Sequence, residues 1–99
     1  MLKISDLRKG MRGVNVRGEI TEVSEAKEVV TRYGTTAKVA TATLKDDSGS
    51  VKLILWNEDI DKVSPGSLVE INNGYTVAFR GVLQLNIGRF GKLMVLNEE

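Results

Sequence analysis

The sequence predicts an all-β fold, a small Greek-key barrel, and three observations support this prediction. The chain has 99 residues, a length that usually makes one domain with one hydrophobic core. Apolar and polar residues alternate with a period of two along several segments, as they do in half-buried strands. Ten glycines and one proline occur singly, and most of them lie between these segments, where they mark turns. We therefore expect one domain over residues 1–99, without an internal linker.

The first expected elements are a helical turn and a bent strand. Residues 4–7 can form a single turn whose Ile4 and Leu7 plug the open end of the barrel. Residues 14–21 then alternate between apolar and polar side chains, which predicts a strand. Gly18, in the middle of this strand, tolerates the sharp bend that allows one strand to pair with two neighbours.

A long hairpin is expected next, over residues 22–37, with Tyr33 and Gly34 at its tip. Acidic residues recur around it every three positions, which could indicate a helix: Glu19, Glu22, Glu25 and Glu28. The surrounding residues are β-branched and form no second apolar stripe. An extended, solvated edge is therefore the better interpretation.

Two further strand candidates, residues 39–44 and 51–56, flank the sequence Asp46-Asp47-Ser48-Gly49. This sequence is typical of a tight hairpin turn, in which Gly49 would supply a positive φ. In the second of these strands the apolar odd-numbered residues are expected to point into the barrel: Val51, Leu53 and Leu55.

A short helix and two more strands complete the pattern. Asn57 is a suitable N-cap with acidic residues after it, so about two helical turns are expected before Pro65. Residues 68–79 and 82–87 are the last strands, and Asn73-Gly74 could form a bulge. Five strands with a helix after the third match the OB-fold, a partly open Greek-key barrel.

The glycine-rich segment Gly88-Arg89-Phe90-Gly91-Lys92 follows the last of these strands. We expect its glycines to turn the chain so that Leu93, Val95 and Leu96 reach the core. Arg89 and Lys92 then become candidate phosphate contacts.

Composition excludes several classes of function. The formal net charge is only +1, which is low for a protein that binds nucleic acid mainly by charge. The chain has no Cys and no His, which excludes disulfide scaffolds, Cys/His zinc sites and imidazole-based catalysis. Its apolar runs reach about four residues, whereas a membrane span needs roughly twenty. We therefore expect no enzyme, no cofactor, no metal and no membrane partner.

Trp56 is the first candidate for ligand binding. Strict alternation along its strand puts Lys52, Ile54 and Trp56 on the outer face. An exposed indole beside a lysine can stack on a base of single-stranded nucleic acid. The alternative is that Trp56 turns inward as a core residue or packs under the helix.

Tyr75 and Phe79 are the next candidates. They are four residues apart in a strand, so their side chains point the same way. A bulge at Asn73-Gly74 could re-aim both rings. Packing on the inner face against Val69 and Ile71 is the alternative.

Charge is unevenly distributed along the chain. No acidic residue occurs from Ile71 to Asn97, while Arg80, Arg89 and Lys92 supply positive charge there. The acidic residues cluster elsewhere, so one face could suit a polyanion. Arg32 and Tyr33, at the tip of the long hairpin, could clamp a base, although incidental exposure is the plainer explanation.

Three segments together resemble a known family. They are Asp46-Asp47-Ser48-Gly49 running on to Trp56, Pro65-Gly66 running on to Phe79-Arg80-Gly81, and Leu83-Gln84-Leu85-Asn86-Ile87-Gly88. They are similar to archaeal single-stranded DNA-binding proteins and replication protein A domains, in the simple one-OB form also found in the human sensor-of-single-stranded-DNA proteins. The resemblance covers nearly the whole chain, and residues 24–36 are its least diagnostic part.

The resemblance implies roles for particular residues. Aromatic residues at the positions of Trp56, Tyr75 and Phe79 stack on bases in that family. Some relatives have a further aromatic at the position of Asn86, which can hydrogen-bond but cannot stack. Some relatives also carry a long tail for partner proteins, which is absent from this chain or was cut away.

These observations predict a module that binds single-stranded DNA with little sequence preference, in DNA replication, recombination or repair. Phosphate or polar contacts are expected from Lys38, Lys52, Arg80, Asn86, Arg89 and Lys92. Other replication or repair proteins, or neighbouring OB domains, are expected partners, and the expected location is cytoplasmic and nucleoid-associated. Two alternatives stay open, an RNA-binding OB domain of the anticodon-binding type and an OB domain that docks a protein.

Overall fold

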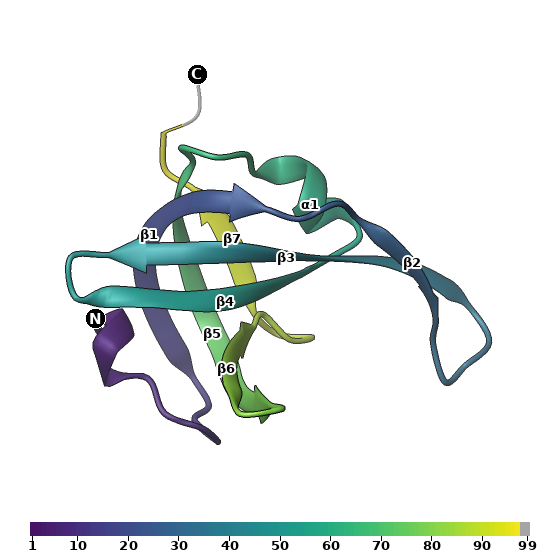
Figure 1. Ribbon diagram of the computed structural model, residues 1–99, viewed down its shortest axis with the longest axis horizontal. Coiled ribbons are helices and arrows are strands. Elements are labelled where there is room, and N and C mark those ends of the chain that lie inside the picture. Colours follow the sequence, from purple (N-terminus) through teal and green to yellow (C-terminus); the bar gives the residue numbers. More distant parts are fainter. Residues whose placement is uncertain (98–99) are drawn as a thin grey trace.

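A computed structural model describes residues 1–97 (Figure 1). Seven strands, an α-helix and a 3-10 helix (η1) are formed within these residues. Their bounds are η1 Ile4–Asp6, β1 Val14–Val23, β2 Lys27–Val30, β3 Thr36–Asp46, β4 Gly49–Trp56, α1 Glu58–Lys62, β5 Leu68–Phe79, β6 Val82–Asn86 and β7 Lys92–Val95. No helix among the described residues is long and apolar enough to cross a membrane.

Five of the strands close into a ring in the order β1, β3, β4, β6 and β5. The ring closes because β1 pairs with β3 on one side and with β5 on the other. All pairs in the ring are antiparallel except β4 with β6. The predicted OB-fold is thereby confirmed, with α1 after the third barrel strand.

Gly18 lies where β1 changes partners. A Cβ atom at this position would lie 2.7 Å from the carbonyl oxygen of Lys45 and 2.9 Å from Cδ1 of Leu44. Only a residue without a side chain lets β3 approach so closely. The prediction that this strand pairs with two neighbours, changing partners at Gly18, is confirmed.

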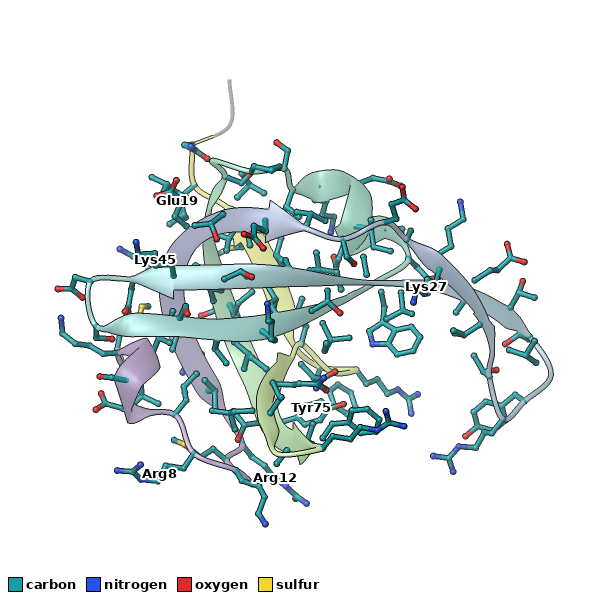
Figure 2. All side chains as sticks on the ribbon, viewed as in Figure 1. Arg8, Arg12, Glu19, Lys27, Lys45 and Tyr75 are labelled. Carbon is teal, nitrogen blue, oxygen red and sulfur yellow. The ribbon has the colours of Figure 1, made fainter. Side chains whose placement is uncertain are left out.

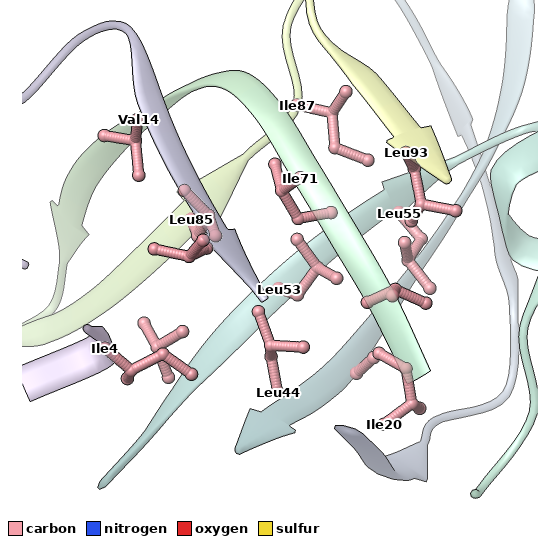
Figure 3. Packing of buried hydrophobic residues seen from close by; sticks show 14 of the residues in the cluster. Ile4, Val14, Ile20, Leu44, Leu53, Leu55, Ile71, Leu85, Ile87 and Leu93 are labelled. Carbon is pink, nitrogen blue, oxygen red and sulfur yellow. The ribbon is translucent and has the colours of Figure 1, made fainter. Parts of the chain in front are cut away.

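The barrel interior is filled by apolar side chains from every ring strand (Figure 3). Leu44, Leu53, Leu55, Ile71 and Leu85 are fully buried. Burying each such side chain stabilises the fold by about 1.5–3 kcal/mol. The alternation of apolar residues along the sequence therefore becomes one contiguous core.

The N-terminal turn closes one end of this core, as predicted. Ile4 and Leu7 are both buried in the hydrophobic cluster. The backbone N–H of Ile4 donates a hydrogen bond of 2.9 Å to Oδ2 of Asp46, and that of Ser5 donates to Oγ of Ser48 at 3.0 Å. The β3–β4 turn thus holds η1 against the barrel.

Two strands were not predicted as separate elements. β2 pairs with β3 to make the long hairpin, which extends outward from the barrel (Figure 1). β7 pairs with the first half of β5 and brings Leu93 into the core. Leu96, which was expected to reach the core as well, is exposed because it follows the end of β7.

Two local predictions, about a turn and a cap, were wrong in full or in part. Gly49 does not adopt a positive φ. Instead, Oδ1 of Asp46 accepts hydrogen bonds from the backbone N–H groups of Ser48 and Gly49, at 2.7 and 3.1 Å, and from the Ser48 hydroxyl at 2.6 Å. Asn57 occupies the N-cap position of α1 as predicted, but its side chain makes no capping hydrogen bond, since its Oδ1 accepts one from the backbone N–H of Lys38 at 3.0 Å.

Candidate nucleic-acid interface

Three aromatic rings are exposed on the outer face of the barrel, on two strands that flank β6. Trp56 ends β4, while Tyr75 and Phe79 lie in β5, and β6 runs between these two strands. The exposed fractions are 42% for Trp56, 39% for Tyr75 and 58% for Phe79. The predicted outward orientation of all three rings is confirmed, and we call this area the aromatic surface.

Alternation along β4 accounts for the position of Trp56. Leu53 and Leu55 are fully buried in the barrel, so Lys52 and Trp56 face outward. Ile54 also faces outward, yet only 9% of it is exposed. It lines the hollow between Trp56 and Tyr75, where it forms an apolar floor.

A bulge in β5 accounts for the positions of Tyr75 and Phe79. Val16 pairs with Ile71 and Val14 pairs with Gly74, so β5 contains one more residue than β1 between these pairs. Asn73 has a left-handed backbone with φ of 57° and its N–H donates to Oδ1 of Asn15 at 3.0 Å. The extra residue reverses which side chains of β5 face outward after Asn73. The bulge predicted at Asn73-Gly74 therefore turns both rings outward.

β6 connects the two sides of the aromatic surface. Asn86 pairs with Tyr75 on β5 and with Ile54 on β4, so it lies in the row between them. Phe79 pairs with Val82 at the other end of β6. Asn86 is half-buried, and its amide can offer only a polar contact there.

Several of the predicted cations lie on this surface. Lys52 pairs with Gln84 of β6, and its Nζ donates to Oγ1 of Thr43 at 3.2 Å. Arg80 forms the β5–β6 turn, and its guanidinium carbon lies 5.3 Å from the centre of the Phe79 ring. Arg89 lines the same hollow as Trp56 and Tyr75.

One acidic residue also reaches this area, which the linear distribution of charge did not predict. Asp59 of α1 lines the hollow beside Trp56 and Tyr75. Its Oδ1 forms an ion pair of 3.2 Å with Nζ of Lys62. The nearby lysine offsets part of its repulsion for an anion.

Tyr75 is held against the backbone of the loop after β6. A Cβ atom at Gly88 would lie 3.0 Å from Cε1 and 3.1 Å from Cδ1 of Tyr75. Gly88 also has a φ of +75°, which L side chains rarely adopt. The sequence-based view that the glycines of this loop serve the turn is therefore incomplete, because Gly88 also makes room for the tyrosine ring.

Some predicted site residues lie elsewhere. Lys38 pairs with Glu28 across the β2–β3 hairpin and lines a hollow that includes Glu58 and Asp61. Lys92 belongs to β7, which flanks β5 before the bulge rather than after it. Neither lysine lines the hollows beside Tyr75.

The hairpin tip also lies apart from the barrel (Figure 1). Tyr33 is 82% exposed, and the Arg32 guanidinium carbon lies 5.8 Å from the centre of its ring. These two residues could contact a ligand only if the ligand extends beyond the aromatic surface or the hairpin bends toward it.

The sequence-based reasoning missed the cations that precede β1. Residues 8–11 run beside β5, since the N–H of Gly10 donates to the carbonyl oxygen of Thr76 at 3.2 Å and the N–H of Thr76 donates to that of Met11 at 3.0 Å. Arg12 follows and lines a hollow with Tyr75, and Figure 2 shows Arg8 and Arg12 at the same end of the barrel as Tyr75. The available signal was three cations within five residues, Arg8, Lys9 and Arg12, outside any predicted strand.

The described residues contain no group of three or more His, Cys, Asp or Glu side chains that could hold a metal ion. What they do present on this face is rings, an amide and cations, with Asp59 as an acidic residue in the hollow. Such a set can stack on planar groups, neutralise phosphates and form a hydrogen bond, all of which suit a single-stranded nucleic acid.

Comparisons with known proteins also indicate a nucleic-acid-binding fold. The chain matches the family described as OB-fold nucleic acid binding domain over residues 14–93. It is 35% identical over 97 residues to the single-stranded DNA binding protein Ssb of Saccharolobus solfataricus, which covers 98% of this chain and 65% of that protein. It is 38% identical over 80 residues to replication factor A of Methanothermobacter thermautotrophicus, which covers 80% of this chain and 10% of that protein.

A solved structure is also similar over nearly its whole length. The second OB-fold domain of replication protein A from Methanococcus maripaludis has a TM-score of 0.82 and 26% identity, covering 99% of this chain and 96% of that one. The chain is thus similar over 99% of its length to a single solved OB-fold domain, and it spans only part of the length of both sequence relatives.

Proposed function

Because this chain belongs to the OB-fold nucleic acid binding domain family and is homologous to archaeal Ssb and replication factor A, we propose that it binds single-stranded DNA by base stacking. The observation that carries this proposal is the exposure of Trp56, Tyr75 and Phe79 together on one outer face. The names of the relatives support DNA as the ligand.

Stacking supplies most of the proposed affinity. Large exposed rings are costly in water unless a partner covers them, and a base stacked on an aromatic side chain gives about 1–3 kcal/mol. Every base has a flat face, so this contact tolerates any sequence. A site of about four to six nucleotides fits one OB unit.

Phosphate contacts would come from the cations around the rings. Lys52, Arg80 and Arg89 lie on the aromatic surface or line its hollow. Asn86 would add a hydrogen bond to a base or sugar. Because Lys38 and Lys92 lie away from these hollows, we now assign them no phosphate contact.

The biological setting is part of the proposal. Covering exposed single strands would serve DNA replication, recombination or repair, alone or beside other OB domains. The proposed action is binding without catalysis, which agrees with relatives named for DNA binding and replication rather than for a reaction.

Fluorescence of Trp56 tests this proposal directly, since it is the only tryptophan in the chain. Stacking on oligo-dT is expected to quench it at low salt. Trp56→Ala, followed with labelled DNA, and Phe79→Ala should each weaken binding by about 1–3 kcal/mol. Leu96→Ala, an equally exposed apolar residue outside the aromatic surface, is the matched control and should change binding little.

The same titration separates the alternatives. Equal quenching by duplex DNA, or none by oligo-dT, would contradict the proposal. Tighter binding of oligo-rU than oligo-dT would indicate an RNA-binding domain. Absence of binding to either would favour docking of a protein on the aromatic surface.

A further inference from the structure

Tyr75 separates two hollows on the outer face. One hollow, of about 290 Å³, also contains Trp56 and belongs to the aromatic surface. The other, of about 240 Å³, lies on the far side and is lined by Arg12, Asn73 and Phe90 among others. Three residues line both hollows and form the ridge between them: Tyr75, Gly88 and Arg89.

The second hollow is better suited to an anion than the first. Two arginines, Arg12 and Arg89, line it, and no acidic residue does. The first hollow has one arginine and also contains Asp59. A phosphate entering the second hollow would therefore meet positive charge on two sides.

The second hollow also offers an aromatic ring that the proposed function does not use. Phe90 is 81% exposed, and the guanidinium carbon of Arg89 lies 5.6 Å from the centre of its ring. A phenylalanine so exposed, beside a cation, is a suitable surface for a base.

Hydrogen bonds fix the backbone of the loop that carries Phe90. Nδ2 of Asn73 donates a hydrogen bond of 3.4 Å to the carbonyl oxygen of Phe90. The N–H of Gly91 donates to the carbonyl oxygen of Gly88 at 3.3 Å, and a Cβ atom at Gly91 would lie only 1.7 Å from the carbonyl oxygen of Ile87. The loop is a tight turn that only glycine permits at this position.

The opposite wall of the hollow is fixed as well. Arg12 follows the segment that is hydrogen-bonded to Thr76, where the N–H of Met11 also donates to Oγ1 of Thr76 at 2.9 Å. Thr76 is buried directly after Tyr75. Residues 73–76 of β5 therefore contact both walls, since Asn73 bonds to the Phe90 carbonyl oxygen and Thr76 bonds to the segment before Arg12.

We propose that this second hollow binds the next nucleotide of the same strand, with its base on Phe90 and its phosphate between Arg12 and Arg89. The strand would cross the ridge at Tyr75, leaving one base on the Trp56 side and one on the Phe90 side. This inference rests on the proposed function, because it extends the same binding path.

A relocated tryptophan tests the proposal. In the double variant Trp56→Phe, Phe90→Trp the only indole is at position 90, and position 56 keeps a ring for stacking. Saturating oligo-dT, with binding followed independently by anisotropy of labelled DNA, is expected to quench this indole. The control is Trp56→Phe, Leu96→Trp, whose indole lies outside both hollows and should keep its fluorescence.

Charge removal gives a second, independent measurement. Arg12→Ala should weaken binding of an oligonucleotide of about eight residues by about threefold or more and reduce the salt slope by about 0.7, the value for one phosphate of a single strand. Lys45→Ala removes the same charge at a residue that Figure 2 shows far from Tyr75, and it should leave the slope unchanged.

The outcomes distinguish the two proposals. If wild-type protein binds oligo-dT and quenches Trp56, but the indole at position 90 keeps its fluorescence, the second hollow is not a nucleotide site. An unchanged salt slope in Arg12→Ala leads to the same conclusion for the phosphate. If the wild-type protein does not bind at all, the proposed function itself fails.

Discussion

The contact between Tyr75 and Gly88 shows how closely single residues define the aromatic surface. The tyrosine ring lies only 3.0 Å from the point that the Cβ of any larger residue at position 88 would occupy. Its orientation therefore depends on an atom that the neighbouring residue lacks. The positive φ of Gly88 adds a second reason for glycine there.

Gly88→Ala is expected to displace the Tyr75 ring and weaken binding of oligo-dT by roughly 1–3 kcal/mol, the value of one base stack. Gly66→Ala is the matched control, since Gly66 also has a positive φ but has open space around its Cβ position. Both variants carry a similar backbone strain of about 1 kcal/mol. Thermal melting should therefore fall in both, while the titration should change only for Gly88→Ala; equal binding by the two variants would contradict this account.

At the scale of elements, β5 carries two different faces on one strand. Before the bulge the buried positions are Val69 and Ile71, and after it they are Gly74 and Thr76. Without the extra residue at Asn73, Tyr75 and Phe79 would have pointed inward. The sequence left both orientations open because period two alone does not say where a bulge lies.

The β3–β4 turn is an element whose stability depends on charge. Burial acts to raise the pKa of the Asp46 carboxyl, but the hydrogen bonds from the Ser48 hydroxyl and from the N–H groups of Ile4, Ser48 and Gly49 outweigh it and lower the pKa below its ordinary value. A carboxyl whose pKa is lower in the folded chain stabilises the fold above its ordinary pKa. That contribution is lost as the pH falls through the lower, folded value.

We expect Asp46→Asn to destabilise the fold by about 1.5–3 kcal/mol near neutral pH, the range for hydrogen bonds to a charged group. Thermal melting from pH 7 down to about pH 2 measures this, and the gap between variant and wild type should narrow as the pH falls below about 4. Asp47→Asn changes the neighbouring carboxyl, which is exposed and pairs with Lys3 at 2.9 Å, and should have a much smaller effect. A gap that stays constant across this range would show that the ionised form of Asp46 contributes nothing.

For the whole molecule, the net charge of +1 averages unlike regions. Acidic residues gather beside α1 and the β2–β3 hairpin, where Glu28, Glu58 and Asp61 line one hollow. Arginines line both hollows beside Tyr75. Because these arginines are few and the net charge is low, we expect the molecule to hold DNA more by stacking than by charge.

Salt dependence measures this balance. With about four phosphate contacts at about 0.7 each, the slope of log K against log salt is expected near −3. Titrations of oligo-dT from about 50 to 400 mM salt provide it, and Arg80→Ala should make the slope shallower by about 0.7. A wild-type slope steeper than about −5 would mean that charge, rather than stacking, dominates binding.

The local pattern of the sequence was enough for the barrel and indicated the outward position of Trp56. Period two along Leu53, Leu55 and Trp56 predicted an outward ring, and the family resemblance favoured it over the inward alternative. The closure of β1 onto two partners was anticipated because Gly18 interrupts an otherwise regular strand. These features depend on residues that are only one or two positions away in the sequence.

Other features depended on contacts between distant segments, and only the tertiary structure decided them. Asn57 looked like a helix cap, yet its side chain bonds to Lys38, nineteen positions earlier. Arg12 joined the site because its segment pairs with β5 around Thr76. Lys38, by contrast, lies away from the aromatic surface, because it pairs with Glu28 in the β2–β3 hairpin.

The sequence by itself thus determined the barrel, its core and the ring-bearing strands, because period two and turn residues act over a few positions. The tertiary structure decided which way β5 faces after Asn73 and which cations surround the rings. Those outcomes depend on the register between strands far apart in the chain, and no local pattern encodes that register.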